Sequence, residues 1–352
     1  MKTKIFSTIG LLAIAAGFVA CDTDVEPMQV QKPFPERESE DYLANLRAYH
    51  ESDHAVFYGY YAAYIQQNSP SMGERIIGLP DSVDIINLWE GVPNPETNPL
   101  AYSDMQYCRK KKGIKFVSHK DAAWQWEFTS ISGEKINCKE LGDEEGMRKY
   151  ADFILEEIYA RDIDGVDLDY EPRDYWNDGG RKITLVCQYL AEQIGPKGKD
   201  PSKLLIVDYF SHTPPQAIGE LCNYFVKQAY GASSAYSLQS TYNAVAGSIP
   251  PEKLIVCEQM GDYRENAGVP FTEADGNTKT SDFWAIEPGS RMYSLEGFAR
   301  WNPTQGRKGG FGGYYFQYDY YHKYGPYHNV RRAIQLCNPS NPDAMPKKET
   351  AE

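Results

Sequence analysis

Eight short apolar runs recur along the chain, and helical patterns separate them. Each run has six or seven residues and is rich in β-branched and aromatic side chains, as buried strands are. The runs are 55–61, 83–89, 114–119, 165–170, 204–210, 225–230, 254–259 and 312–317, and the clearest helical patterns are 144–161, 181–194 and 294–301. Strands that alternate with helices form parallel sheets, and eight such units close a barrel of about 250 residues. We therefore expect a single (β/α)8 TIM barrel with its active site where the strands end.

The composition fits such a barrel and excludes some partners. Hydrophobic residues make up 41% of the 352 residues, which is enough to fill a barrel core. The 27 tyrosines are unusual: most must pack inside, but those at strand ends would suit sugars, whose apolar faces lie beside hydroxyls. The net charge of −13 argues against nucleic acid or an anionic membrane surface as a partner.

The N-terminus has the pattern of a targeting segment. Two lysines precede the apolar run 9–19, which is too short to span a bilayer. A small residue directly before Cys21 resembles a bacterial lipoprotein signal, with Phe18 where leucine is usual. We therefore expect 1–20 to be a signal peptide and Cys21 to carry a lipid that anchors the protein to a membrane, in bacteria the outer membrane or cell surface. An ordinary secretory signal with a coincidental cysteine is the alternative.

The rest of the chain divides by composition. Residues 21–45 are rich in proline and acids, which is typical of a flexible tether. Residues 46–340 contain all eight strand-like runs and form the expected barrel domain, and 341–352 form a polar tail.

One strand-like run carries a row of acids. Asp167, Asp169 and Glu171 are spaced two apart, so a strand places their carboxylates on one face. Gly165 lets the chain enter this strand, and Pro172 ends it. Because crowded carboxylates repel one another, at least one proton should be retained near neutral pH, and a glycosidase needs such a proton for the leaving oxygen. A strand with a solvated acidic face is the alternative.

Residues 164–171 read DGVDLDYE and resemble the DGxDxDxE signature of glycoside hydrolase family 18. The resemblance implies retaining hydrolysis in which the substrate's own acetamido group, and no protein nucleophile, attacks the anomeric carbon. It implies that Glu171 protonates the glycosidic oxygen and later activates water, that Asp169 orients the acetamido group, and that Asp167 exchanges a proton with Asp169. Asp164 lies off the face of the three acids, so we expect a structural role for it.

The end of the sixth run adds a second part of the site. Family members commonly carry a tyrosine there that hydrogen-bonds the acetamido carbonyl, which implies this role for Tyr230, with Gln228 on the same face as a substrate contact. Chitinases of the family often read Met-x-Tyr-Asp at this point, whereas this chain has Gln228 and Gly231 at the first and last positions. These departures favour the endo-β-N-acetylglucosaminidase branch. An ordinary barrel tyrosine is the alternative for Tyr230.

Other segments resemble the family's pattern less closely. Residues 59–64 are similar to its GYYxxW pattern, with tyrosine in place of tryptophan, which implies that Tyr60 lies under the reacting sugar. The second run ends with Trp89 at the expected catalytic rim, and the stretch 81–89 again resembles the endo branch. The third run ends in SHK at 118–120, where chitinases usually read SxGG.

Aromatic residues in the expected loops are candidates for glycan contacts. Trp124 and Trp126 lie in the third βα loop, where buried loop anchors are an equally good interpretation. In the eighth run, chitinases usually carry a tryptophan at the position of Gln317, so Tyr315 or Tyr318 would have to supply the floor of the pocket.

The cysteines and histidines give no metal-binding pattern. Six cysteines follow Cys21 without a CxxC pair, and no histidine stands at metal-ligand spacing, so we expect no metal and no cofactor. Disulfides stay open, because the compartment could be oxidising. Glu258, at the end of the seventh run, either lines the cleft or pairs with an arginine.

We therefore interpret the chain as a monomeric endo-β-N-acetylglucosaminidase that acts on the chitobiose core of N-glycans or glycoproteins. Two alternatives stay open. A chitinase-like hydrolase would use the same mechanism but is disfavoured by Gln317 and Gly231. A cell-surface glycan-binding protein on an inactive barrel is opposed by the intact Glu171, Asp169 and Tyr230.

Overall fold

The computed structural model describes residues 39–65, 71–280 and 290–339. The signal segment, Cys21 and the C-terminal tail 341–352 lie outside these residues. The chain divides into two compact units, Met1–Leu43 and Ala44–Glu352. Helix α2 (Glu40–Glu51) begins inside the segment expected to be a flexible tether, and acids in its first turn favour a helix start.

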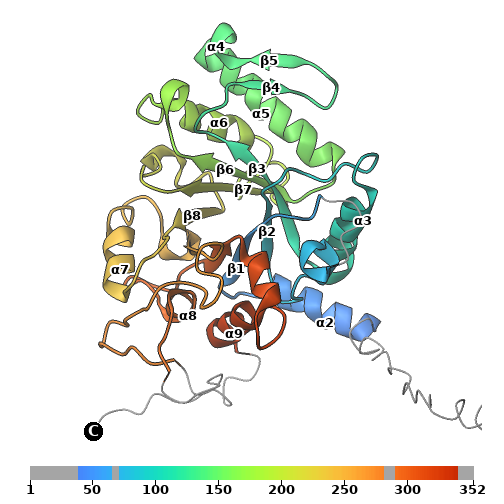
Figure 1. Ribbon diagram of the computed structural model, residues 1–352. Helices are drawn as coiled ribbons and strands as arrows, with labels where there is room; N and C mark the ends of the chain where they lie inside the picture. The colour runs from blue at the N-terminus through green and yellow to red at the C-terminus, as the bar shows by residue number, and fades with distance from the viewer. Residues whose placement is uncertain (1–38, 66–70, 281–289, 340–352) are drawn as a thin grey trace, which may run out of the picture. The chain divides into compact units, whose positions relative to one another are not determined.

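Eight parallel strands close into a barrel in the second unit (Figure 1). They are β1 (Val56–Tyr61), β2 (Ile85–Leu88), β3 (Lys115–Asp121), β6 (Gly165–Tyr170), β7 (Leu204–Tyr209), β8 (Tyr224–Gln228), β9 (Leu254–Gln259) and β10 (Gly310–Tyr314). The order around the barrel is β1-β10-β9-β8-β7-β6-β3-β2, and every neighbouring pair is parallel. The (β/α)8 barrel predicted from the eight apolar runs is therefore confirmed.

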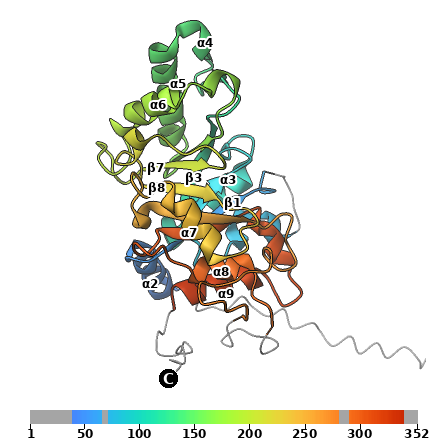
Figure 2. The same ribbon diagram turned by 90° about the vertical axis from the view of Figure 1, so that its left-hand side faces the viewer.

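Helices surround these strands (Figure 2). They are α3 (Pro99–Tyr107), α5 (Asp143–Ala160), α6 (Arg181–Ala191), α7 (Ala235–Asn243), α8 (Ser294–Arg300) and α9 (His328–Cys337). Helix α5 shows the sequence logic, because acids fill its first turn and its apolar residues recur every three or four positions to form one buried face. That face includes Met147, Tyr150, Ile154 and Ile158.

The loop after β3 carries a small hairpin that the sequence did not predict. Its strands β4 (Glu127–Thr129) and β5 (Lys135–Asn137) pair antiparallel and lead into the short helix α4 (Cys138–Leu141). Phe128 stacks on Tyr150 of α5 with ring centroids 4.2 Å apart, which fixes the hairpin to the barrel's outer layer.

The barrel interior changes from apolar to polar toward the strand ends. Its buried apolar residues include Ile85, Val117, Ile206 and Val226. Side chains alternate along a strand, so the same inward face two residues later carries Asn87, His119, Asp208 and Gln228. The fold thereby places a ring of polar groups at the end of the barrel where active sites of this architecture lie.

Two glycines permit close approaches that no other residue allows. Gly165 enters β6 with φ of +150°, and a Cβ there would lie 2.1 Å from the carbonyl oxygen of Leu204. A Cβ on Gly312 would lie 1.7 Å from the carbonyl oxygen of Tyr58. The expected entry role of Gly165 therefore has a steric cause.

Two predicted strands run two or three residues past their observed ends, and both corrections affect the expected site. Strand β8 ends at Gln228, so Tyr230 stands in the turn beyond it. Strand β10 ends at Tyr314, because Tyr315 adopts a left-handed conformation with φ of 55° and opens a 3-10 helix over Phe316–Tyr321. Gln317 is therefore a buried residue of this helix and not the floor position of an eighth strand.

The six cysteines of the described residues are unpaired. Within those same residues, no helix has the length and apolarity needed to cross a membrane.

Candidate active site

The row of acids on β6 runs from the barrel core toward solvent. Asp167 is fully buried, the side chain of Asp169 is 16% exposed, and that of Glu171, just past the strand's end, is 24% exposed. Because the three acids are two residues apart on one strand face, their exposure to solvent rises stepwise from Asp167 to Glu171. Only the outermost is well placed to meet a leaving group in solvent, because Asp167 lies at the bottom of the series.

A fourth acid, Asp208, joins this series from the neighbouring strand. Strands β6 and β7 pair with Asp169 directly beside Asp208, and the Asp208 side chain is fully buried. Burial, followed by the charges of Asp169 and Asp167, raises the pKa of Asp208 well above its usual range. Asp208 was not among the residues predicted for the site, although an acid near the end of the apolar run 204–210 was a usable signal.

Asp167 is held by donors from two other strands. The hydroxyl of Tyr58 donates to its Oδ2, and Nδ2 of Asn87 donates to the same oxygen at 2.8 Å. Asn87 also donates to the Tyr58 hydroxyl at 3.1 Å, so the three side chains form a closed network. Burial raises the pKa of Asp167 to about 6, although these donors act in the opposite direction.

Asp169 lies where the charges of the other acids meet. Burial, and then the charge of Glu171, raise its pKa to about 7. Oδ1 of Asp169, Oδ1 of Asp167 and Oδ2 of Asp208 have no hydrogen-bond donor among the described residues. An ionised carboxylate only accepts, so these oxygens are best satisfied when protons are retained between them. This agrees with the proton retention expected from the sequence.

His119 flanks Asp169 from β3. Its Nε2 lies 3.8 Å from Oδ2 of Asp169, yet burial and the charge of Lys120 lower the pKa of His119 to about 3. The imidazole is therefore neutral near neutral pH, and it lines the cluster without neutralising it. The His119 ring also contacts Trp89, with centroids 4.3 Å apart. This contact connects the acid row to the aromatic side chains at the strand ends.

Glu171 has two cationic neighbours. Nη2 of Arg173 lies 3.6 Å from Oε2 of Glu171, and the Arg173 guanidinium covers the ring of Trp124 at 4.5 Å. Lys227 donates to the carbonyl oxygen of Phe210, and burial lowers its pKa to about 8 against the opposing charge of Glu171. Trp124, which is 54% exposed, is thus brought beside the outermost acid through Arg173.

Aromatic side chains gather near the acids at the strand ends. Tyr230 lies 6.0 Å from Tyr314 and 6.1 Å from Phe210, measured between ring centroids. Burial, followed by the charge of Asp208, raises the pKa of Tyr230 well above its usual range, so its hydroxyl stays a donor. The structure therefore brings Tyr230 to the acids, even though it lies beyond the strand that was expected to hold it.

Tyr314 is the central ring of this aromatic group and was not singled out from the sequence. Its ring lies 5.0 Å from Trp89, 5.7 Å from Tyr60 and 4.0 Å from Tyr315. Tyr60 is only 1% exposed, so Tyr314 covers more of the accessible surface at the strand ends. Tyr314 is thus better placed than Tyr318 to form the floor of the pocket.

Three of the expected substrate contacts occupy different surroundings. Gln228 donates its Nε2 to Oδ1 of Asp208 at 2.7 Å, so its amide supports the buried acids. Trp126 lies under the ammonium of Lys139, 3.2 Å from the ring centroid, which makes it an anchor of the hairpin loop. Tyr318 packs 6.0 Å from Tyr315, measured between ring centroids.

The acids outside this row serve the fold. Asp164 accepts from the backbone nitrogen of Phe116 and pairs with Arg109 at 2.9 Å, which is the structural role expected from its parity. Glu258 accepts from the backbone nitrogen of Gly231 at 2.7 Å and from the Ser294 hydroxyl. Of the two roles left open for Glu258, the pairing with an arginine is not the one observed among the described residues, because these donors already satisfy both carboxylate oxygens.

In the part of the chain that the structure describes, the acid row coincides neither with a metal-binding group of side chains nor with the cavity of about 730 Å³ at this end of the barrel. No group of three or more metal-ligating side chains suited to an ion occurs within the described residues. The lining of the cavity includes Tyr318 but none of the four acids. The candidate site, which consists of the carboxylates and Tyr230, is therefore separate from this cavity at the same end of the barrel.

Comparison with known proteins gives consistent matches. The family model described as glycoside hydrolase family 18, BT1044-like, matches residues 21–336. Endo-beta-N-acetylglucosaminidase F2 of Elizabethkingia meningoseptica is 26% identical over 344 residues, covering 91% of this chain and 92% of that protein. The solved structure of BT1044 has a TM-score of 0.67 at 20% identity, covering 85% of this chain and 93% of the other. A mutant endo-beta-N-acetylglucosaminidase from Cordyceps militaris, in complex with fucosyl-N-acetylglucosamine-Asn, has a TM-score of 0.63 at 23% identity, covering 86% and 97%. At these identities, the structural likeness shows the fold.

Proposed function

Because the chain belongs to glycoside hydrolase family 18, we propose that it is an endo-β-N-acetylglucosaminidase that cleaves the chitobiose core of N-glycans with retention of configuration. The observation that carries the proposal is the graded row of Asp167, Asp169 and Glu171 at the strand ends, with Tyr230 nearby. The names of two relatives, the Elizabethkingia and Cordyceps enzymes, support the same activity.

In the first step, Glu171 gives its proton to the glycosidic oxygen while the substrate's acetamido oxygen attacks the anomeric carbon. The leaving sugar departs with that proton, and a cyclic oxazolinium forms with positive charge at the acetamido nitrogen. Asp169 is the carboxylate that orients this nitrogen and balances its charge. The Tyr230 hydroxyl donates to the acetamido oxygen, which holds the group in line for attack.

Asp169 must lose its own proton as the oxazolinium charge develops. Its pKa of about 7 leaves a large protonated fraction in the resting enzyme near neutral pH, so the proton needs an acceptor close by. Asp167, with a pKa of about 6, is largely ionised near neutral pH, and its Oδ1 has no donor among the described residues. We assign Asp167 to take this proton, and Tyr58 and Asn87 hold this acceptor in place, while Gln228 holds the neighbouring Asp208.

In the second step, Glu171 removes a proton from water, which attacks the anomeric carbon and opens the oxazolinium. Attack from both sides in turn gives net retention. Nη2 of Arg173 lies 3.6 Å from Oε2 of Glu171, so a positive charge stands beside the carboxylate that exists between the two steps. The Arg173 guanidinium also covers the ring of Trp124, so its charge lies beside an exposed aromatic surface on which the glycan can stack.

The proposal is tested by incubating the purified protein with an N-glycosylated protein and, separately, with chitin oligomers. We expect release of glycan from the glycoprotein, β-configured product at first appearance in NMR, and slow cleavage of the oligomers. Rapid cleavage of chitin oligomers without release from the glycoprotein would assign a chitinase-like activity. Binding of glycan without cleavage of either substrate would assign a glycan-binding protein.

We further propose that Cys21 carries a lipid that anchors the barrel to a membrane. The proposal is supported by the short apolar segment and the small residue before Cys21 in the sequence. It is tested by replacing Cys21 with alanine, as described below.

A further inference from the structure

The cavity beside the catalytic site is built from segments that lie at the strand ends. Its lining comes from 264–267 after β9, from 290–296 at the start of α8, and from 318–333 between β10 and the first turns of α9. Each segment follows a strand or begins the next helix, so the cavity opens on the end of the barrel that holds the acids. A volume of about 730 Å³ is in the range of ligand sites.

Cations without acidic partners line this cavity. The side chains of Arg264, Arg291 and Lys323 are exposed, and none of them forms an ion pair within the described residues. In a chain of net charge −13, such a group of unpaired cations is unexpected. It creates a local positive potential that favours an anionic ligand.

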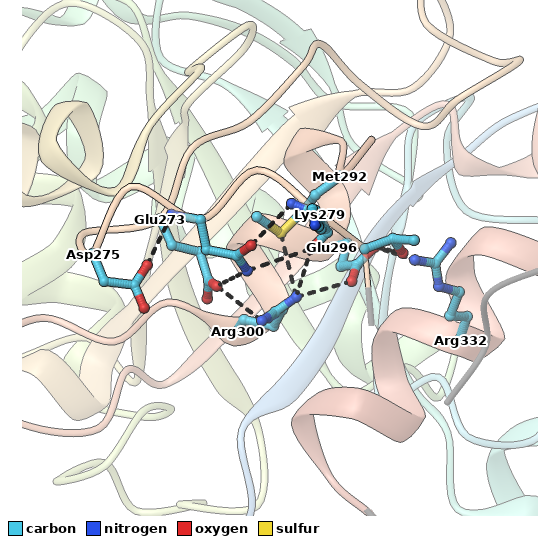
Figure 3. Close-up of polar contacts among 9 residues, drawn as sticks. Glu273, Asp275, Lys279, Met292, Glu296, Arg300 and Arg332 are labelled. Carbon is cyan, nitrogen blue, oxygen red and sulfur yellow. Dashed lines mark hydrogen bonds and ion pairs between the residues drawn. The ribbon is translucent and has the colours of Figure 1, made fainter. Parts of the chain in front are cut away.

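Two acids also reach the lining, and one of them is neutralised by its neighbours. Glu296 accepts from Arg300 at 3.2 Å and from Arg332 (Figure 3). The Thr280 hydroxyl also donates to Glu296, at 2.7 Å. Arg300 also pairs with Glu273 at 2.8 Å, which ties the long loop after β9 to α8. The cavity wall is thus held by a paired network, and Glu265 is the remaining acid in the lining.

The cavity also offers flat faces for sugar rings. Tyr318, Tyr321 and Tyr324 line it with 38%, 57% and 48% of their surfaces exposed. Tyr318 is linked to Tyr230 through Tyr315 and Tyr314, by ring-to-ring steps of 6.0, 4.0 and 6.0 Å. A chain of aromatic surfaces therefore connects the cavity to the reacting sugar.

We propose that this cavity binds a carboxylate-bearing sugar at the outer end of the glycan whose core is cleaved. This inference rests on the proposed function. A guanidinium matches a carboxylate with two parallel hydrogen bonds, and a tyrosine face takes the apolar side of the sugar ring. Arg264 lies 5.3 Å from the ring of Tyr318, so charge and stacking surface are presented together. A neutral glycan would bring no negative charge to pair with the cations of the cavity.

The test compares one glycoprotein before and after enzymatic removal of its terminal sialic acids, with kcat/KM measured for each form. We expect the wild type to prefer the acidic form by about tenfold, the low end for a hydrogen bond to a charged group. The variant R264Q/R291Q should lower this ratio to near one, mainly through KM. A sulfated glycan in a parallel assay distinguishes a general anion site from a carboxylate site.

The matched control is K197Q/K199Q, which removes two positive charges from the loop before β7, at the end of the barrel where the strands begin. This control should keep the wild-type ratio, and equal thermal midpoints should show that both variants fold. Equal kcat/KM for the two glycan forms in the wild type would overturn the cavity assignment while leaving the proposed function intact. Cleavage of neither form would instead reject the proposed function.

Discussion

Replacement of Asp169 by asparagine should abolish hydrolysis and, at the same time, stabilise the folded protein at alkaline pH. The pKa of Asp169 is raised to about 7 because burial and the charge of Glu171 penalise its ionised form. In the unfolded chain, the pKa of an aspartate is about 3.9. Between these two values the folded protein binds more protons than the unfolded chain, so the free energy of unfolding falls as pH rises through this window.

The size of this effect follows from the shift. About three pKa units at about 1.36 kcal/mol per unit give a penalty of up to about 4 kcal/mol once the pH exceeds the folded pKa. Asparagine keeps the shape of the side chain but cannot ionise, so D169N avoids the penalty. Unfolding of roughly 300 residues carries an entropy of about 0.6 kcal/mol per degree, so Tm should rise by about 3–6 °C at pH 8. Near pH 5, where most of the penalty is absent, the rise should be much smaller.

The assay is thermal unfolding of wild type and D169N at pH 5 and pH 8, alongside glycan release. Tyr230→Phe is the matched control. It removes another active-site group, but the pKa of Tyr230 lies well above its usual range and this residue does not titrate in the window. Y230F should therefore slow hydrolysis without changing the pH dependence of stability. An equal Tm difference between D169N and wild type at both pH values would refute the buried-charge argument.

Three further outcomes are expected from the same account. Glu171→Gln should reduce turnover at least about a hundredfold while glycan binding in calorimetry persists, and near-normal turnover would show that another group is the acid. Gly165→Ala should cost at least about 2 kcal/mol in urea unfolding, because its φ of +150° and the 2.1 Å approach to Leu204 both exclude a Cβ; unchanged stability would contradict the steric argument. Cys21→Ala should move the protein from the membrane fraction to the soluble fraction, because each buried lipid CH2 contributes about 0.8 kcal/mol; continued membrane fractionation would exclude the lipid anchor.

The barrel could be predicted from the sequence because its signals are local and repeated. Each apolar run has the length of a buried strand, and a period of two places Asp167, Asp169 and Glu171 on one face whatever surrounds them. The bounds of β6 and β9 agree with the predicted runs 165–170 and 254–259 for the same reason. A glycine marks the start of β6, and the pattern of apolar residues marks the extent of β9.

The missed parts of the site depend on contacts that local sequence does not encode. Asp208 becomes part of the acid row only because β7 pairs in register with β6. Strand β10 ends where Tyr315 adopts a left-handed conformation, and tyrosine gives no turn signal in a sequence. The strand was therefore predicted to be too long, and the floor of the pocket was expected at Tyr315 or Tyr318 instead of Tyr314. Trp124 and Trp126 could not be distinguished in the sequence. The position of Lys139 over the ring of Trp126 shows that Trp126 is the loop anchor and Trp124 the exposed ring.

The most direct test of the central claim is the intact mass of an N-glycosylated protein after incubation with the purified wild type and with E171Q. The account predicts that the wild type removes the glycan but leaves one N-acetylglucosamine on each asparagine, and that E171Q leaves the glycoprotein mass unchanged over the same period. Complete removal of the glycan with conversion of asparagine to aspartate, an unchanged mass with the wild type, or equal activity in E171Q would contradict the account.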